Sequence, residues 1–187
     1  MISNEALWAL GRGTGITALV MLTVSMVLGV LTRSGRPMLG LPRFGVLSVH
    51  QFASLAATAL IALHVTTLVI DPYAQLDLVD VIIPFGGSYE WLWVGLGTLA
   101  LDLMIVLVVT ALLRHRLGHR TFRVVHWAAY ALWPIALAHG MGSGTDAGTV
   151  WMIAIDIACI ALVVSAIALR LRADFTEFSD NRKVALR

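Results

Sequence analysis

The sequence has few charged residues and a single cysteine. Charged residues make up 13% of the 187 positions and hydrophobic residues 59%, against about 25% and about 45–50% in an average soluble protein. The mean hydropathy of +0.87 therefore predicts an integral membrane protein. The one cysteine, Cys159, excludes an intrachain disulfide and a metal cluster held by several thiolates. The net charge of +2 is too small and too dispersed to indicate nucleic-acid binding.

Apolar runs then define the expected fold. A bilayer core of about 30 Å needs about 20 helical residues to cross it. Runs of this length cover approximately residues 6–31, 45–70, 90–113, 122–141 and 150–171. We therefore predict an all-α fold, an integral membrane bundle of five transmembrane helices in a single domain over residues 1–187. The first residues, MISNEALWAL, lack the basic stretch and cleavage site of a signal peptide, so we expect the first run to remain in the mature protein.

The distribution of charge predicts the topology. The first and third connections carry three and four arginines, whereas residues 71–90 carry only acidic charges. The positive-inside rule then places the N-terminus outside, the C-terminus in the cytoplasm, and residues 173–187 in a short cytoplasmic tail of a multi-pass cytoplasmic-membrane protein. The expected aromatic anchors near the outer boundary are Trp8, Tyr73, Tyr89, Trp91, Trp93 and Trp151.

Four histidines lie inside these apolar runs, two on each of two helices. His50 and His64 lie on the second span, and His126 and His139 on the fourth. Both helices are predicted to run from inside to outside, so His50 and His126 lie near the cytoplasm and the other two about 20 Å further out. Ionisable groups at such depth are costly and therefore mark functional candidates.

The number of imidazoles at each depth discriminates between kinds of ligand. Zinc needs three or four converging protein ligands, whereas a haem iron takes two axial ligands and is often held by histidine. The pattern therefore predicts two copies of haem b, an inner one on His50 and His126 and an outer one on His64 and His139.

The two histidines of the second span are predicted to point to the same side of their helix, but those of the fourth span are not. His50 and His64 are close to four full turns apart and share a face. On an ideal helix, His139 lies about 140° away from His126. We expect Pro134 to permit an irregularity around Trp133–Pro134 that brings His139 back toward the bundle axis.

These residues carry a resemblance to a known family. The His50-x13-His64 pair is followed by LLRHRLGHRTFRVVHWAAYALWPIALAHG, in which a basic loop leads into the His126-x12-His139 helix. The chain resembles the ferric reductase-like transmembrane domain, shared by ferric reductases, NADPH oxidases and the haem-binding subunit of the periplasmic methionine sulfoxide reductase system. The resemblance implies electron transfer from a cytoplasmic flavin, through the inner and then the outer haem, to an acceptor at the outer face.

The donor and the acceptor stay open. No Gly-x-Gly-x-x-Gly follows a predicted strand, and residues 173–187 are too few for a dinucleotide-binding fold, so we expect a separate cytoplasmic flavin reductase or a quinol as donor. Oxygen, ferric chelates, quinone and a periplasmic redox protein are all candidate acceptors. Two other interpretations are a quinol-linked cytochrome b subunit and a haemless structural subunit, and catalysis by this chain alone is not established.

Three arginines are candidate partners of haem propionates. Arg12, about two turns below the outer boundary, is expected to contact either the outer propionates or Asp156, and the family resemblance favours a propionate or acceptor-site role. Arg43 and Arg123 are the arginines nearest in sequence to the two inner histidines.

Three smaller expectations complete the sequence analysis. Asp102 is expected either to be protonated and hydrogen-bonded to a Thr or Ser, or to hold a ligating imidazole by its second nitrogen. His115 and His119 have no third ligand beside them and are expected to be solvated loop residues. The stretch GRGTG, residues 11–15, predicts close helix packing.

Overall fold

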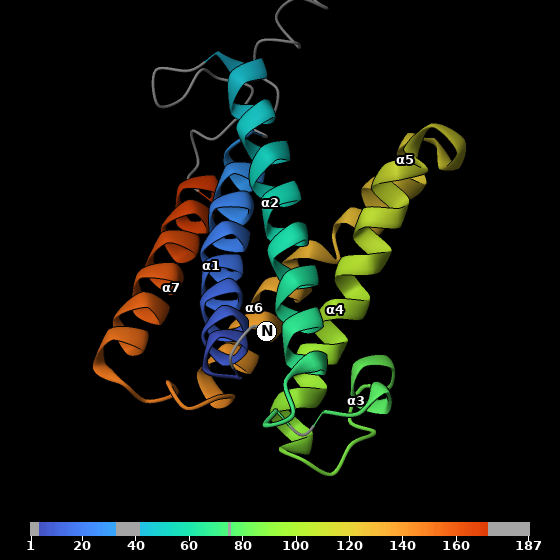
Figure 1. Ribbon diagram of the computed structural model, residues 1–187. Coiled ribbons are helices and arrows are strands. Elements are labelled where there is room, and N and C mark those ends of the chain that lie inside the picture. The colour runs from blue at the N-terminus through green and yellow to red at the C-terminus, as the bar shows by residue number, and fades with distance from the viewer. Residues whose placement is uncertain (1–3, 33–41, 75, 172–187) are drawn as a thin grey trace, which may run out of the picture.

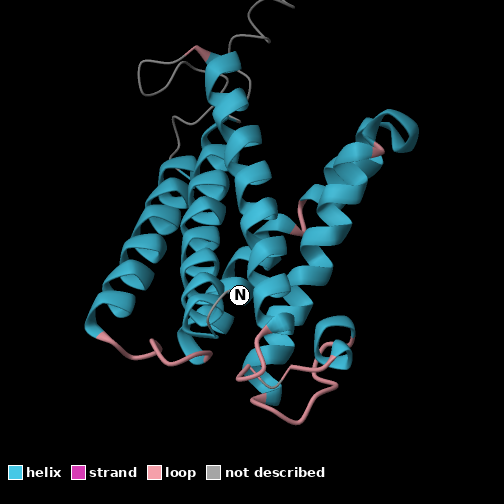
Figure 2. Cartoon of the chain, in the orientation of Figure 1, coloured by secondary structure: helices cyan, strands magenta, loops and turns pink. Residues whose placement is uncertain are grey.

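The computed structural model describes residues 4–32, 42–74 and 76–171, and within these ranges the chain forms helices joined by short loops (Figures 1 and 2). The helices are α1 (Asn4–Leu31), α2 (Arg43–Ile70), α3 (Leu78–Ile82), α4 (Trp91–Leu112), α5 (Arg114–His126), α6 (Ala129–Gly142) and α7 (Val150–Leu171). No strand occurs in the described ranges, which confirms the predicted all-α class.

Four helices of the described part, α1, α2, α4 and α7, are long and apolar enough to cross a membrane. They correspond to the predicted spans 6–31, 45–70, 90–113 and 150–171. The remaining predicted span, 122–141, is not one continuous helix, because the chain divides it between the end of α5 and the 14-residue α6. At 1.5 Å per residue α6 is only about 21 Å long, so it does not cross a bilayer by itself.

The interruption lies at Trp127–Ala128, and the expectation of an irregularity at Trp133–Pro134 is wrong in its position. Both residues have the backbone angles of a 3₁₀ turn, with φ −61° and ψ −24° at Trp127 and φ −61° and ψ −19° at Ala128. The amides of Trp127, Ala128 and Tyr130 each bond to the carbonyl three residues earlier. α6 instead continues through Pro134, which has no N–H to donate and therefore removes one hydrogen bond from the helix.

α1 is the central element of the bundle. It packs against α2, α6 and α7, and α4 packs against α6 on the other side of the molecule. In Figure 1, α7, α1 and α2 stand side by side, and α4 leads into the projecting α5. Of the histidine-bearing helices, α2 and α6 thus both pack against α1, whereas α5 packs against α4.

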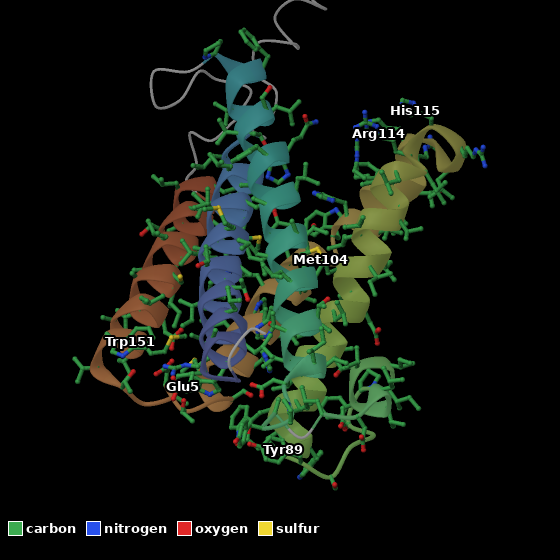
Figure 3. The ribbon with its side chains drawn as sticks, in the orientation of Figure 1. Glu5, Tyr89, Met104, Arg114, His115 and Trp151 are labelled. Carbon is green, nitrogen blue, oxygen red and sulfur yellow. The ribbon has the colours of Figure 1, made fainter. Side chains whose placement is uncertain are left out.

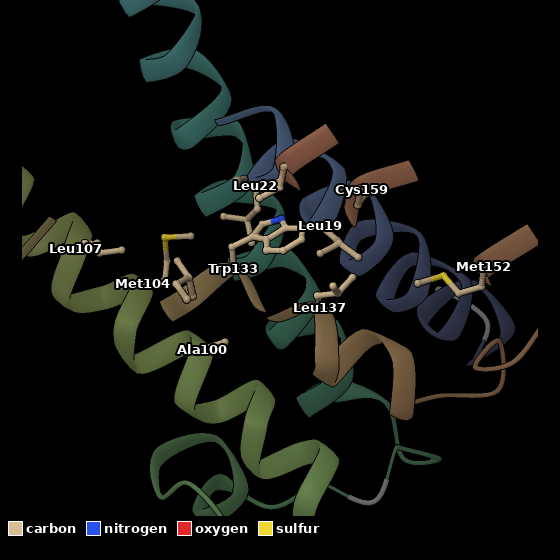
Figure 4. Close-up of a cluster of buried hydrophobic side chains, with 12 residues drawn as sticks. Leu19, Leu22, Ala100, Met104, Leu107, Trp133, Leu137, Met152 and Cys159 are labelled. Atoms are coloured by element: carbon tan, nitrogen blue, oxygen red, sulfur yellow. The ribbon is translucent and has the colours of Figure 1, made fainter. Parts of the chain in front are cut away.

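The hydrophobic core lies between the helices of the bundle (Figure 4). It combines side chains of α1, α2, α4, α6 and α7, with Trp133 of α6 at its centre. The Trp133 indole donates a hydrogen bond of 2.9 Å to Thr23 Oγ1. Cys159 is buried in the same cluster, as its position in an apolar run suggested.

The hydrogen bond between Trp133 and Thr23 gives a stability prediction. Thr23→Val keeps the side-chain shape but leaves the buried indole N–H without its acceptor, which costs about 1–3 kcal/mol. We expect a lower midpoint of thermal unfolding in detergent for Thr23→Val than for Thr23→Ser, which keeps the hydroxyl. Equal midpoints for the two variants would contradict the role of this hydrogen bond.

The ends of the bundle separate residues as the charge distribution predicted. Figure 3 shows Glu5, Tyr89 and Trp151 near one end and Arg114 and His115 near the other. The residues expected at the outer boundary and those of the basic loop therefore lie at opposite ends of the helices.

Candidate functional site

Two pairs of imidazoles face one another at two levels of the bundle. The ring centres of His50 and His126 are 6.3 Å apart, with an angle of 87° between the ring planes. Those of His64 and His139 are 6.4 Å apart, at 74°. The structure thus brings together the same pairs that the sequence predicted, and all four side chains are only partly buried.

The local backbone accounts for part of the rotation that brings the second pair together. A 3₁₀ turn has 3.0 residues per turn instead of 3.6, so each of its residues rotates the chain by about 20° more than an α-helical residue does. The turn at Trp127–Ala128 adds this rotation between His126 and His139. Over these two residues the extra winding is about 40°, which turns His139 part of the way back toward the side of the bundle that His126 faces.

The second ring nitrogen of three histidines is held by a backbone carbonyl of a neighbouring helix. The hydrogen bonds run from Nδ1 of His50 to the Ser25 carbonyl (2.9 Å), of His64 to Gly11 (2.6 Å) and of His139 to Trp93 (2.8 Å). A carbonyl oxygen only accepts, so Nδ1 carries the hydrogen in each ring. Nε2 then keeps a free lone pair, the protonation state in which a neutral imidazole binds a metal.

The spacing of the rings fits two axial ligands of one flat group. Metal–imidazole bonds of about 2.0–2.1 Å put the two nitrogens about 4 Å apart, and the half-width of each ring brings the centres to roughly 6 Å. The observed 6.3 and 6.4 Å agree with this separation. In the described part of the chain, no cluster of three or more His, Cys, Asp or Glu suited to a metal ion occurs, so a zinc-type site is not built there.

His126 has a different setting from the other three histidines. It is the last residue of α5, directly before the 3₁₀ turn. Its ring stacks on Phe122, one turn earlier in the same helix, with 5.3 Å between the ring centres and 26° between the planes. The position of this ligand candidate therefore depends on where α5 ends.

Arg12 is held near the expected outer end of the bundle by two contacts. It forms an ion pair with Asp146, in the loop between α6 and α7, and its guanidinium lies 3.8 Å from the centre of the Trp8 ring. The expected ion pair with Asp156 is therefore wrong, because the loop carboxylate reaches Arg12 instead. Asp156 is 5% exposed, and its Oδ1 has no hydrogen-bond partner within the described ranges.

The remaining charged candidates are less constrained. Arg123 is exposed on α5, and the side chain of Arg43 lies outside the described residues. Asp102 is half-buried and makes no hydrogen bond to any residue that the structure describes. Neither expectation for Asp102 is therefore met, and backbone carbonyls take the role of holding imidazoles instead.

Sequence reasoning missed one contact close to the inner pair. Arg170 of α7 donates a hydrogen bond of 2.8 Å to the Tyr130 hydroxyl, and its guanidinium lies 5.9 Å from the centre of the Trp127 ring. These contacts tie the end of α7 to the 3₁₀ turn after His126. The sequence showed Arg170 only as one of several basic residues at the C-terminal end.

The helices and the two histidine pairs, one above the other in the bundle, define a multi-pass helical membrane protein. Each pair is a candidate site for a group held by two imidazoles. A family model described as ferric reductase like transmembrane component matches residues 14–137. The chain belongs to this family, which confirms the resemblance and indicates transmembrane electron transfer. The match includes His50, His64 and His126 and ends two residues before His139. Neither curated proteins nor solved structures give a match.

Proposed function

We propose that this chain binds two haem b groups and conducts electrons across the membrane, from a cytoplasmic flavin reductase to an extracytoplasmic acceptor. His50 and His126 are the inner ligands, and His64 and His139 the outer ones. The observation that carries the proposal is the presence of two imidazole pairs with ring centres 6.3 and 6.4 Å apart. When bound, haem supplies a one-electron couple whose potential depends on its ligands and surroundings.

The protein's own contribution is to orient the ligands before the cofactor binds. A hydrogen bond from Nδ1 to a carbonyl fixes the tautomer and the ring orientation, and it raises the basicity of Nε2. His50, His64 and His139 all have this bond. Ser25 adds its hydroxyl 3.3 Å from His50 Nδ1 and joins it to Ser54 by a hydrogen bond of 2.7 Å. The ligand set is thus held by three helices, α1, α2 and α4, and by the chain around α6.

The proposed topology has the N-terminus outside and five crossings, with the end of α5 and α6 forming the fourth. Its support is the charge distribution and the separation of Trp151 and Tyr89 from Arg114 and His115 along the bundle (Figure 3). In this orientation residues 173–187 are cytoplasmic and the membrane is the cytoplasmic membrane.

Donor access is proposed next to α5. An open hollow of about 500 Å³ on the surface of α5 is lined by Arg114, His115, Gly118, His119 and Phe122. Phe122 stacks on His126, so this hollow lies beside an inner ligand. Its basic lining suits an anionic donor such as a flavin nucleotide, with a quinol as the alternative donor.

Arginines are the proposed partners of the haem propionates, Arg12 outside and Arg43 and Arg123 inside. For Arg12 the support is structural, because its Nε has no hydrogen-bond partner in the described part although Asp146 binds the other side of the guanidinium. An arginine presents several donors in a planar fork, so it binds two carboxylates at once.

The variant Arg12→Gln tests two roles of the Arg12 side chain, its ion pair with Asp146 and its proposed contact with a haem propionate. Side-chain exposures of 26% for Arg12 and 18% for Asp146 place the pair between surface and buried cases, so the variant is expected to lose about 1–3 kcal/mol of stability. Thermal unfolding of Arg12→Gln, Asp146→Asn and the double variant measures the coupling. We also expect a lower midpoint potential for the outer haem in Arg12→Gln, since a nearby cation favours the reduced form.

An unchanged outer-haem potential in Arg12→Gln would contradict the propionate assignment. A double variant whose loss equals the sum of the two single losses would contradict the ion pair. Arg116→Gln, at an exposed arginine of α5 that does not line the proposed donor site, is the matched control for removal of a positive charge.

The proposed function is tested in sealed vesicles that contain the purified protein. A flavin reductase with its nicotinamide cofactor is placed on the side of the basic loop, and an impermeant oxidant is enclosed on the other side. The proposal expects oxidant reduction that depends on the protein and on its haem. No transfer by a haem-loaded protein from a flavin or a quinol donor would overturn it.

A further inference from the structure

Three glycines lie directly against the three imidazoles that donate to carbonyls. A Cβ added at Gly15 would lie 2.8 Å from both Cε1 and Nδ1 of His64. One added at Gly97 would lie 2.7 and 2.8 Å from the same atoms of His139, and one at Gly29 would lie 3.3 Å from Cε1 of His50. Each ring thus occupies the space that a side chain would take.

The glycines and the carbonyls stand in one repeated relation. The carbonyl that accepts from Nδ1 belongs to the residue four positions before the glycine: Gly11 before Gly15, Ser25 before Gly29, and Trp93 before Gly97. In an α-helix the carbonyl of residue i points toward the amide of residue i+4, and the two residues lie on one face. A ring that reaches this carbonyl from a neighbouring helix must therefore lie over residue i+4.

We infer that Gly15, Gly29 and Gly97 are positioning residues for the haem ligands, each forming with the carbonyl one turn earlier a socket for an imidazole. The inference rests on the proposed function, because it takes the four imidazoles to be haem ligands that the sockets orient. Any larger residue at these positions would push the ring off its carbonyl and turn Nε2 away from the facing imidazole. The same device occurs twice on α1 and once on α4, and it serves both levels of the bundle.

Close helix packing alone does not account for these glycines. At Gly11 the nearest atom to an added Cβ is Leu68 Cδ2, at 3.0 Å, as expected where a glycine accommodates an aliphatic neighbour. At Gly15, Gly29 and Gly97 the nearest atoms belong to the imidazoles themselves. The GRGTG stretch therefore combines two roles, since Gly11 supplies helix contact and a carbonyl, and Gly15 the space for a ring.

Alanine variants of two kinds test the inference on the full-length purified protein. Gly15→Ala and Gly97→Ala disturb the outer pair. Gly13→Ala and Gly140→Ala are matched controls, because an added Cβ meets nothing within 4 Å at Gly13 and only atoms at 3.9 Å at Gly140. Haem content, the electron paramagnetic resonance spectrum of the oxidised haems and the thermal unfolding midpoint are measured for each.

We expect Gly97→Ala and Gly15→Ala to lower the affinity for the outer haem about 10–100-fold, as loss of an imidazole's outer partner does. The remaining outer haem should show a shifted low-spin signal while the inner signal is unchanged. Gly29→Ala should shift the inner signal alone and by less, because its added Cβ is further from the ring. Both controls should match the wild type.

The outcomes separate this inference from the proposed function. If the wild-type protein binds two haems, and Gly97→Ala has the same haem content and spectrum as Gly140→Ala, the inference is overturned and the proposed function stands. Equal loss of both haems in a folded Gly97→Ala variant would also overturn it, because the effect would not be confined to the outer pair. If Gly97→Ala does not fold, Gly29→Ala, with the milder contact, decides in the same way. Wild-type protein without haem would overturn both proposals.

Discussion

Replacing His64 with alanine is expected to lower the haem content from two per chain to one. The variant deletes one of the two proposed outer ligands and leaves His139 without the facing imidazole, whereas the inner pair of His50 and His126 is untouched. Electron transfer to an acceptor outside the membrane should fall to the rate of protein-free vesicles. Haem extraction, the oxidised spectrum and the vesicle assay measure these three effects.

A histidine of α5 provides the control for the haem content of His64→Ala, and it corrects the expectation that His115 lies in a loop. His115 lies on α5 and belongs to neither pair, so His115→Ala should keep both haems. Retention of two haems in His64→Ala would contradict the assignment of the outer site. Loss of both haems would show that the two sites do not form independently.

The second large effect is expected for His126→Ala, which removes a proposed inner ligand. Here too one haem should remain, but it should accept electrons from the outer side, whereas the haem that remains in His64→Ala should accept them from the cytoplasmic side. The remaining outer haem should be reduced by an impermeant reductant supplied at the outer face. It should not be reduced by a cytoplasmic flavin reductase, because the entry site for electrons is gone.

The comparison of the two histidine variants tests the order in which the two proposed haems receive electrons. With His64→Ala, the flavin reductase should still reduce the remaining inner haem. Reduction of both variants at wild-type rates from the cytoplasmic side would contradict the assignment of inner and outer levels. The comparison needs no assumption about the physiological acceptor.

Helices and histidine pairs were predictable from the sequence because both depend on simple periodicities. Four of the predicted spans correspond to α1, α2, α4 and α7, since a long apolar run is a strong signal. His50 and His64 share a face because their separation is close to a whole number of turns. The sequence also predicted which histidines face one another across the helices. The loop charges indicated that both helices run in the same direction, so histidines at matching positions along them lie at the same depth.

The irregular parts depend on contacts between segments far apart in the sequence. Proline is the usual sign of a helix irregularity, yet the break lies at Trp127–Ala128, where Arg170 of α7 contacts Tyr130 and the Trp127 ring. Arg12 pairs with Asp146 because the loop before α7 reaches it, and loop paths are not encoded in periodicity.

The supports of the imidazoles were hidden from sequence reasoning for a different reason. Every residue except proline has the same backbone N–H and C=O groups, so nothing in the sequence marks the carbonyls of Ser25 or Trp93 as acceptors. The glycines were visible, and GRGTG correctly predicted close packing. A glycine on a neighbouring helix at the depth of a histidine is the signal that would have identified the sockets.

The most direct test of the central claim is the haem content of the purified wild-type protein, measured by extraction together with its reduced-minus-oxidised spectrum. Two haem b groups per chain, both low-spin as expected of two imidazole ligands each, is the predicted result. One haem or none, in protein that is folded by its thermal unfolding transition, would contradict the account.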